Sequence, residues 1–451
     1  MAGVLLDAVS IDMKVPGRRL GIALPSLLVV LSAYPAAGAD GGLSFADAFA
    51  LALAQNPDVR VAQTDVAQAE AQVLVARQLP NPILSGQTTK IPTGGTGAST
   101  PMGNGFFDRS YDSVVALSQT VEVGGKRKDR RLSAEAALAA AHARLRDTRR
   151  SVGNAVAHAY ASALLASHNA SILRESAISL DRSSELAGVR FEAGEISESD
   201  RLQVEIAAGR FRADAETAKG NLRTTLVVLA ALLGSSGGTG PLRLSDTLET
   251  LESSFLASTP EPGASLPDPV GLRPDVEAAL RGVEKAEAEH ALQVAFRIPD
   301  PTFLVQYERE PPDRPNSAGI GISFTLPLFN RNQGAIRAAD ASRDAARIEV
   351  ERVRARARSE LATAASNFET ARTRAKTLVA ELLPKARQVR ETVAFSWKEG
   401  AASLLELLEA ERNLNDLRLA AAAARVDLVL AAVDERAARG LLPAGSPEKP
   451  R

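Results

Sequence analysis

The sequence predicts a mainly α-helical fold with a small β part, in which a long helical hairpin that carries two strands occurs twice. A strand pattern runs directly into a long helix pattern at residues 318–337, and the same passage occurs earlier at residues 113–131. Alanine-rich tracts dominate the chain, whereas aromatic residues make up only 4% of it. This composition suits long helices packed on one another better than a thick globular core.

The strand pattern at residues 318–328 places an apolar side chain at every second position. Small, polar or ring-bound residues lie between them, which is typical of a strand with one apolar face. The apolar positions are Ile320, Ile322, Phe324, Leu326 and Leu328. Asn330 and Gly334 interrupt the pattern, and a proline-free segment then runs from residue 335 to residue 383. A strand is therefore expected to lead into a long helix.

The chain contains an internal duplication. Thr120 and Ser118 align with Thr325 and Ser323 at an offset of 205 residues. Three further pairs of segments repeat at offsets of 217, 219 and 206, namely 56–59 with 273–276, 80–82 with 299–301, and 191–194 with 397–400. A loop at residues 93–105, longer by 14 residues in the first copy, accounts for the fall from 219 to 205. We therefore expect two repeats, residues 40–233 and residues 272–439.

Residues 1–39 are predicted to be a secretory signal peptide. Basic residues precede an apolar run at residues 20–33, and Ala37 and Ala39 supply a small-residue cleavage site. Met13 is a possible true start. The alternative is a membrane anchor, but Pro25 interrupts a run that is shorter than the ~20 residues of a spanning helix. The absence of cysteine excludes disulfides, thiolate metal sites and lipid attachment to a cysteine.

The elements are expected in the same order in both repeats. The first repeat should contain a helix over 43–79 with a start or kink at Pro57, strands over 83–90 and 114–123, a helix over 126–192 and a return helix over 199–233. The second should contain a helix over 274–298, strands over 302–308 and 319–328, a long helix to residue 397 that Pro384 kinks, and a return helix over 403–439. Residues 234–271 are expected to be a linker or a small irregular (equatorial) subdomain between the repeats, and residues 440–451 a disordered tail.

Four strands with exposed edges need closure, because an open edge pairs with any other available strand. Membrane barrels begin at about eight strands, so one chain cannot close a barrel alone. Three chains would supply 12 strands, which predicts a barrel shared within a homotrimer. The alternative is a set of soluble amphipathic strands.

Three features together resemble the TolC-like outer-membrane factor family, the exit ducts of tripartite efflux pumps and one-step secretion systems in bacteria with two membranes. They are the repeated segments 56–58 and 273–275, the two strand-to-helix junctions, and Gly400 followed by Glu406, Glu409 and Ala410. Residues 125–127 and 326–334 look most like the branch that serves RND pumps of the cobalt-zinc-cadmium type. The resemblance covers nearly all of residues 43–439. It implies a 12-stranded transmembrane β-barrel and a trimeric α-barrel tunnel of 12 helices.

The resemblance implies a passive duct in the cell outer membrane that extends into the periplasm. Its expected partners are two further copies of the chain, a periplasmic adaptor protein, an inner-membrane RND-type pump and outer-membrane lipid. Heavy-metal cations are the first expectation for cargo, and drug efflux or one-step polypeptide secretion are alternatives. A periplasmic coiled-coil adaptor is a further alternative, but such a protein has one hairpin between β-rich domains, whereas the pattern here occurs twice. Neither an enzyme, a cofactor nor a nucleic-acid partner is expected, since no catalytic motif is visible and the net charge is −1.

The two turns at the ends of the long helices are the expected adaptor-docking tip. Phe191 and Trp397 lie three residues before Gly194 and Gly400, and glycine permits both a sharp turn and the close approach of a partner helix. The family's docking motif is a Val-Gly pair, which this chain replaces with other residues before each glycine. The alternative is that the aromatic side chains pack only within the trimer.

Glu406 and Glu409 are the expected periplasmic gate, because they lie on one face of the return helix just past the turn. The resembled family has acidic residues at this constriction, and Asp200 occupies the matching position of the first copy. Three chains would form a ring of carboxylates that admits cations and repels anions. The alternative is that these acids only face solvent.

No metal site is expected. The histidines are His142, His158, His168 and His290, and none lies three or four residues from another, the spacing that places two ligands on one helix face.

Overall fold

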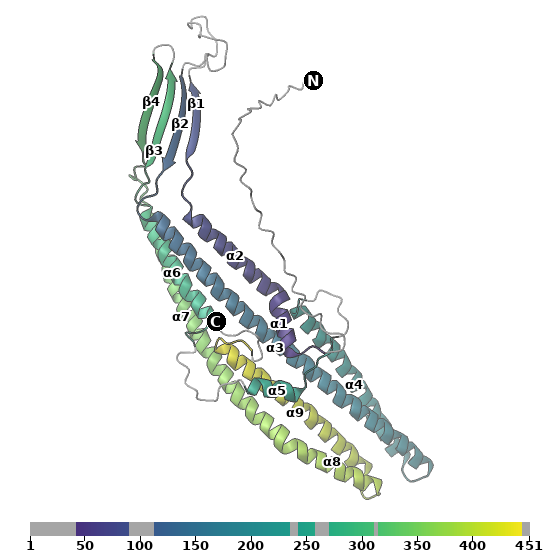
Figure 1. Cartoon of the computed structure of the whole chain (residues 1–451). Coiled ribbons are helices and arrows are strands. Elements are labelled where there is room, and N and C mark those ends of the chain that lie inside the picture. Colours follow the sequence, from purple (N-terminus) through teal and green to yellow (C-terminus); the bar gives the residue numbers. More distant parts are fainter. Residues whose placement is uncertain (1–41, 90–111, 235–241, 258–269, 311–313, 444–451) are drawn as a thin grey trace, which may run out of the picture. The chain divides into compact units, whose positions relative to one another are not determined.

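The computed structural model describes residues 42–89, 112–234, 242–257, 270–310 and 314–443 (Figure 1). The predicted signal peptide, the loop at 93–105 and residues 444–451 of the predicted tail lie outside these ranges. Residues from Gly42 onward form one compact unit. Its elements are α1 Phe45–Gln55, α2 Pro57–Arg77, β1 Ile83–Thr89, β2 Asp112–Thr120, α3 Lys126–Glu192, α4 Glu198–Leu232, α5 Leu248–Leu256, α6 Pro274–Ala295, β3 Thr302–Glu310, β4 Arg314–Ser323, α7 Gln333–Ala375, the π-helix η2 Lys376–Leu382, α8 Leu383–Lys398 and α9 Leu404–Ala438.

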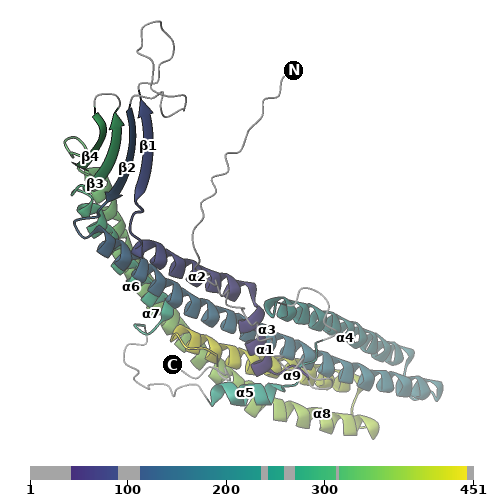
Figure 2. The same cartoon turned by 45° about the horizontal axis from the view of Figure 1, so that its top comes forward.

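The 67-residue helix α3 is the longest element, and its bounds are those predicted. At ~1.5 Å per residue such a helix extends for about 100 Å. In Figures 1 and 2, α2 and α4 both lie along α3, one beside each part of it. Arg77 of α2 pairs with Glu135 at 3.0 Å, and Arg212 of α4 pairs with Asp181 at 3.1 Å. The shorter helices therefore share one long partner, as the fold class predicted.

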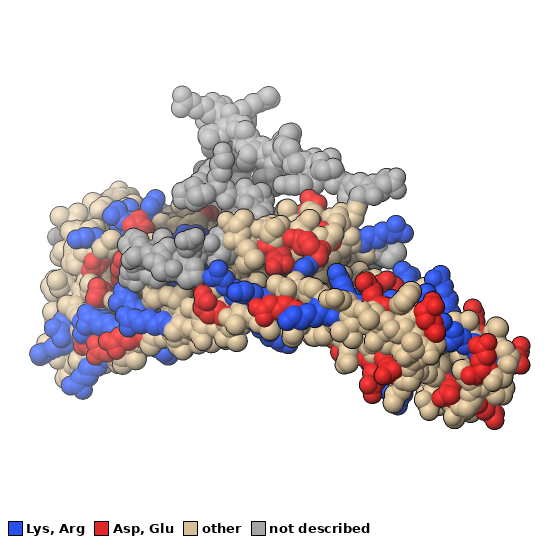
Figure 3. Space-filling view, turned by 90° about the horizontal axis from the view of Figure 1, so that it is seen from below, with Lys and Arg blue, Asp and Glu red and all other residues tan. Residues whose placement is uncertain are grey.

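Ion pairs between exposed side chains recur where the helices lie side by side. Arg347 of α7 pairs with Glu287 of α6 at 3.0 Å, and Arg374 of α7 pairs with Asp427 of α9 at 2.9 Å. Charged side chains of both signs are interspersed over the helices in Figure 3. Exposed pairs of this kind contribute only ~0–1 kcal/mol each, so packing of small apolar side chains carries most of the helix association.

The described strands form one antiparallel sheet in the order β1-β2-β3-β4. The central pairing of β2 with β3 joins the two copies, and Thr302 lies opposite both Thr120 and Ser323. Strands β2 and β4 therefore end before the predicted strands 114–123 and 319–328 do, and they also begin earlier, at Asp112 and Arg314. Alternation continues beyond Thr120 and Ser323, but β3 begins at Thr302, so no neighbouring strand is left for the ladder.

The expected helix over 43–79 is two helices. Asn56 ends α1 and caps α2, because its side-chain oxygen accepts a hydrogen bond from the Asp58 N–H at 2.9 Å. Its side-chain amide also donates to the Leu232 carbonyl at 2.9 Å and ties this break to the end of α4. Pro57 occupies the first helical position, where its missing N–H has no consequence. Of the two options for Pro57, a helix start is the correct one.

The predicted linker at 234–271 contains a helix that the sequence pattern did not reveal. Helix α5 buries Leu248, Leu251 and Phe255. The Phe255 ring lies 5.0 Å from that of Phe45, and Phe45 contacts Tyr160 edge-on at 5.7 Å. This aromatic cluster is the centre of the largest apolar core, where α1, α3 and α5 meet.

Tyr160 carries the polar end of this cluster. Its hydroxyl donates to the Asp246 carboxylate at 2.7 Å and contacts the Leu43 carbonyl at 2.9 Å. Burial and the hydrogen bond to Asp246 raise the pKa of Tyr160 well above its ordinary value. The phenol therefore stays neutral and holds the chain entering α1 against the segment before α5.

The second long helix changes its winding before Pro384. Residues Lys376–Leu382 are π-helical, and α8 follows with Pro384 in its first turn. Proline has no N–H to donate and crowds the preceding turn, and a π-helical turn relieves both conflicts by adding a residue. A local disruption at Pro384 was predicted as a kink, whereas the structure shows a π-helix.

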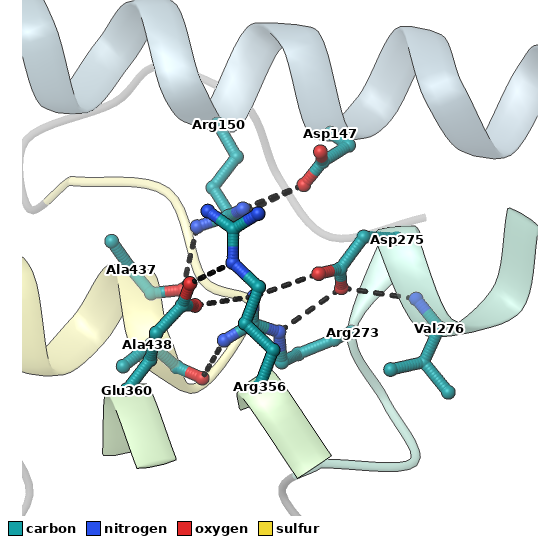
Figure 4. A network of polar contacts seen from close by, with 9 residues as sticks. All are labelled: Asp147, Arg150, Arg273, Asp275, Val276, Arg356, Glu360, Ala437 and Ala438. Carbon is teal, nitrogen blue, oxygen red and sulfur yellow. Dashed lines mark hydrogen bonds and ion pairs between the residues drawn. The ribbon is translucent and has the colours of Figure 1, made fainter. Parts of the chain in front are cut away.

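A polar network around the buried Arg273 side chain joins four helices near the start of the second repeat (Figure 4). The Arg273 side chain, which is 2% exposed, binds Asp275 at 2.7 Å, Glu360 of α7 at 2.8 Å and the Ala438 carbonyl at the end of α9 at 3.1 Å. Arg150 of α3 donates to the neighbouring carbonyl, Ala437, at 2.9 Å. The repeated segment 273–275 therefore acts as a clamp on the carboxyl end of α9.

Candidate functional site

The two turns between the long helices and their return helices have the same backbone conformation. Gly194 and Gly400 have φ values of 74° and 75°, a region that favours glycine. In each turn the N–H of the glycine donates to the carbonyl of the aromatic residue. The N–H of the residue after the glycine donates to the carbonyl of the residue before the aromatic one, as in a Schellman cap. A Cβ atom at either glycine would meet no atom within 4 Å. The turns are therefore open surfaces.

The two aromatic side chains at the turns differ in their surroundings. Trp397 is 8% exposed, and the Arg190 guanidinium lies 4.7 Å from its ring centre. Arg190 also donates to the Lys398 carbonyl at 3.4 Å. Phe191 is 37% exposed, with Arg201 5.4 Å from its ring. Trp397 therefore links the two turns inside the chain, whereas Phe191 is available at the surface.

A hollow of about 560 Å³ lies between the two turns. Its lining combines charged and apolar residues from both copies, including Arg190, Glu195, Asp200, Trp397, Gly400 and Leu405. Sequence reasoning found the glycines and aromatics of this region but missed Arg190, because no local pattern shows that a cation of one turn stacks on the tryptophan of the other.

Glu406 and Asp200 each complete a capping box at the start of a return helix. Ser403 N–H donates to the Glu406 carboxylate at 2.7 Å, and the Glu406 N–H donates to the Ser403 hydroxyl at 3.3 Å. Ser197 and Asp200 repeat the arrangement in α4. This structural role was not predicted, although a serine three residues before an acid is its sequence signature.

Capping affects the charge of Glu406. The Ser403 backbone N–H and then its hydroxyl stabilise the carboxylate, so the pKa of Glu406 is lowered from its ordinary value of 4.5. Glu409 lies one turn further along the same face; it is exposed and makes no hydrogen bond or ion pair within the described residues. The structure thus places Glu406, Glu409 and Asp200 beside the turns.

The four connections between sheet and helices are fastened to one another. Lys126, which is 2% exposed, binds the Asp300 carboxylate at 2.7 Å and the Ile298 carbonyl at 2.6 Å. Asp300 also accepts from the Val123 N–H at 2.9 Å. Asn332 donates to the Gln293 carbonyl at 2.7 Å, and Gln119 to the Pro80 carbonyl at 2.9 Å. These bonds fix the direction of the strands relative to the helices that follow.

Two of the four histidines each contact one carboxylate. His158 lies 2.8 Å from Asp434, and His290 lies 3.2 Å from Asp340. Among the described residues, no three acids or histidines gather as a metal site would require. Every helix of the described chain also lacks the apolar length needed to cross a membrane.

Comparisons with known proteins agree with this architecture. A family model described as "Outer membrane efflux protein" matches residues 49–235 and 270–440. The chain is 27% identical over 388 residues to the cobalt-zinc-cadmium resistance protein CzcC of Cupriavidus metallidurans, covering 84% of this chain and 86% of that protein. It is 25% identical over 318 residues to the nickel-cobalt-cadmium resistance protein NccC of Alcaligenes xylosoxydans xylosoxydans, covering 70% and 68%.

Solved structures share the fold at low sequence identity. The CusC structure aligns with a TM-score of 0.74 at 19% identity, over 88% of this chain and 92% of that one. The CmeC outer membrane channel of Campylobacter jejuni aligns with a TM-score of 0.70 at 19% identity, over 90% and 87%. The paired helical hairpins, the four-stranded sheet and the two-part family match lead to one conclusion: the chain belongs to the outer membrane efflux protein family, and it is the outer-membrane exit duct of a tripartite efflux system and not an enzyme.

Proposed function

We propose that the protein works as a homotrimer that carries heavy-metal cations out of the cell. Proteins of this family work with a periplasmic adaptor and an inner-membrane pump. The observation that carries the cargo proposal is the similarity to two metal-resistance proteins over most of the chain. Drug efflux and polypeptide secretion remain the alternatives.

The open edges of the sheet support a trimer. Strands β1 and β4 each have one neighbouring strand in the described sheet, so each has an outer edge with no strand paired to it among the described residues. Pairing of β4 with β1 of the next protomer would satisfy both edges, and three protomers would close a 12-stranded barrel in the outer membrane. The helices would then extend into the periplasm, and the two turns would form the tip that docks the adaptor.

Deletion of the gene is expected to lower the tolerance of the host to one or more of zinc, cobalt, cadmium and nickel. The reason is that the pump has no exit across the outer membrane without its duct. The measurement is growth over a concentration series of each metal, with dyes and detergents tested in parallel. A host that becomes sensitive to dyes and detergents alone would reject metal cations as cargo and favour drug efflux.

We further propose that Glu406, Glu409 and Asp200 line the periplasmic constriction. The double variant Glu406→Gln, Glu409→Gln is expected to lose most of the cation selectivity of the channel in planar bilayers, because the negative ring loses two of its three carboxylates per chain. Glutamine also fits a capping box, so the Ser403 cap is preserved while the charge is removed. Reversal potentials in a salt gradient measure the effect.

The matched control is Glu369→Gln, Glu391→Gln, which removes two exposed carboxylates elsewhere on α7 and α8. It should leave selectivity unchanged. Because the pKa of Glu406 is lowered, more than half of this residue is ionised at pH 4.5, where a glutamate of ordinary pKa is half protonated. Part of the wild-type selectivity is therefore expected to persist at that pH. Equal selectivity of the wild type and the Glu406/Glu409 variant would remove these acids from the constriction.

A further inference from the structure

The connections between sheet and helices concentrate positive charge. We define the junction collar as residues 77–82, 121–131, 296–301 and 324–337, which are the four connections between strands and helices, the last residue of α2 and the first turns of α3 and α7. It contains nine Lys and Arg residues and three acids, a net charge of +6 in a chain whose total is −1. The remainder of the chain therefore has a net negative charge, and the excess positive charge lies where the sheet meets the helices.

Internal ion pairs neutralise only part of the collar. Glu122 binds Arg130 at 2.6 Å, and Asp300 binds the buried Lys126 at 2.7 Å. Four other cations are exposed and form no ion pair with the described residues, namely Lys128, Arg297, Arg331 and Arg337. They come from three of the four connections, so they are spread along one end of the sheet.

Exposed apolar side chains lie directly on the strand side of these cations. Phe329 is 94% exposed, Leu328 64% and Leu326 64%, and Arg331 follows two residues after Phe329. Ile298, which is 50% exposed, follows Arg297 on the side of β3. Such a change from apolar to basic within two residues matches the boundary between hydrocarbon and headgroups of a bilayer, where aromatic side chains lie at headgroup level and cations beyond them.

We propose that the junction collar binds the headgroups of anionic phospholipids, with Lys128, Arg297, Arg331 and Arg337 as the phosphate-binding side chains. Arginine and lysine donors hold phosphate oxygens by charge-assisted hydrogen bonds. The adjacent apolar residues contact the acyl chains, which distinguishes a lipid from free phosphate as the ligand. The proposal rests on the outer-membrane location of the duct, and it is independent of the cargo and of the constriction.

The test compares the thermal unfolding of the purified protein in detergent with dioleoyl phosphatidylglycerol or dioleoyl phosphatidylcholine added. The anionic lipid is expected to raise the Tm by about 4 °C more than the zwitterionic lipid, because a ligand of the folded state stabilises it. The difference should shrink at high salt, and inorganic phosphate at the same concentration should not reproduce it. Equal stabilisation by the two lipids would overturn the proposal.

The variant Lys128→Gln, Arg297→Gln, Arg331→Gln, Arg337→Gln should lose the difference between the lipids. The matched control Arg60→Gln, Arg223→Gln, Arg354→Gln, Arg358→Gln removes the same charge from exposed helix positions outside the collar and should keep it. Loss of the difference in both variants would show a nonspecific charge effect and contradict a collar site. If the collar variant does not fold, native mass spectrometry of the wild type in an equal mixture of the two lipids tests the proposal instead. Preferential retention of the anionic lipid supports the collar site, and equal retention of both lipids contradicts it.

Discussion

Arg273→Met is expected to destabilise the protein by about 3 kcal/mol and to lower the yield of assembled protein sharply. Removal of one partner of a buried ion pair leaves the other charge without compensation, which is strongly destabilising. Here the Arg273 side chain is 2% exposed, and its loss would leave Asp275 without its cation and the Ala438 carbonyl without its donor. Thermal unfolding of the purified protein and the membrane yield measure the effect.

Arg281→Met is the matched control. It removes an arginine from α6, the helix that follows Arg273, but the Arg281 side chain is 40% exposed and its one ion pair among the described residues is with Glu284, at 2.9 Å. This variant should unfold within about 0.5 kcal/mol of the wild type. If the two variants prove equally stable, the clamp on the end of α9 contributes nothing to the fold.

The network also predicts how stability changes with pH. Burial acts to raise the pKa of Asp275 and of Glu360, but hydrogen bonds and charges from arginines outweigh it, and both pKa values lie below their ordinary 3.8 and 4.5. The folded state therefore binds these protons less readily than the unfolded chain. Their contribution to stability is complete above the ordinary pKa values and is lost as the pH falls through the lowered ones. In Arg273→Met this acid sensitivity should be reduced.

Gly400→Trp is expected to abolish efflux while the trimer still assembles. The turn is open around Gly400, so the indole would project outward into the surface proposed for the adaptor. Tryptophan at a positive φ also adds a backbone strain of roughly 1–2 kcal/mol, which is too small to unfold the chain. Metal tolerance of a complemented deletion strain measures efflux, and cross-linking measures assembly.

Two control variants separate the possible causes of the loss. Gly400→Asn keeps the turn with little strain, since asparagine tolerates a positive φ, and should retain most efflux. Gly220→Trp places the same bulk on an open face of α4, away from the turns, and should retain it fully. Wild-type efflux in Gly400→Trp would show that the adaptor does not approach this glycine closely.

Sequence reasoning was accurate where the information is local. The proline-free run between Gly125 and the Gly194 turn defined α3 to the residue, and strand alternation located the sheet. The strand ends were wrong because the length of a strand depends on its neighbour. Nothing near Phe324 shows that β3 begins at Thr302, opposite Ser323.

In the candidate site too, the sequence predicted the local features but not the contacts between distant residues. Gly194 and Gly400 were found from their repeated context, and their positive φ values fit the turns expected there. The contact of Arg190 with Trp397 joins residues 207 positions apart, and only folding brings them together. Helix α5 was not predicted because Gly, Ser and Pro dominate the composition of the segment around it. The helix itself has only nine residues, which is too few for its apolar pattern to stand out.

The pairing of β2 with β3 has a consequence for the order of folding. Thr120 and Thr302 are 182 residues apart, whereas Ile83 and Ser118 within the first hairpin are 35 apart. Closing the longer loop is disfavoured by about 1.4 kcal/mol more chain entropy, so each hairpin should form before the central seam. During synthesis the first hairpin therefore waits with an unpaired edge until the second emerges, and this interval is when the chain is most exposed to pairing with the wrong partner.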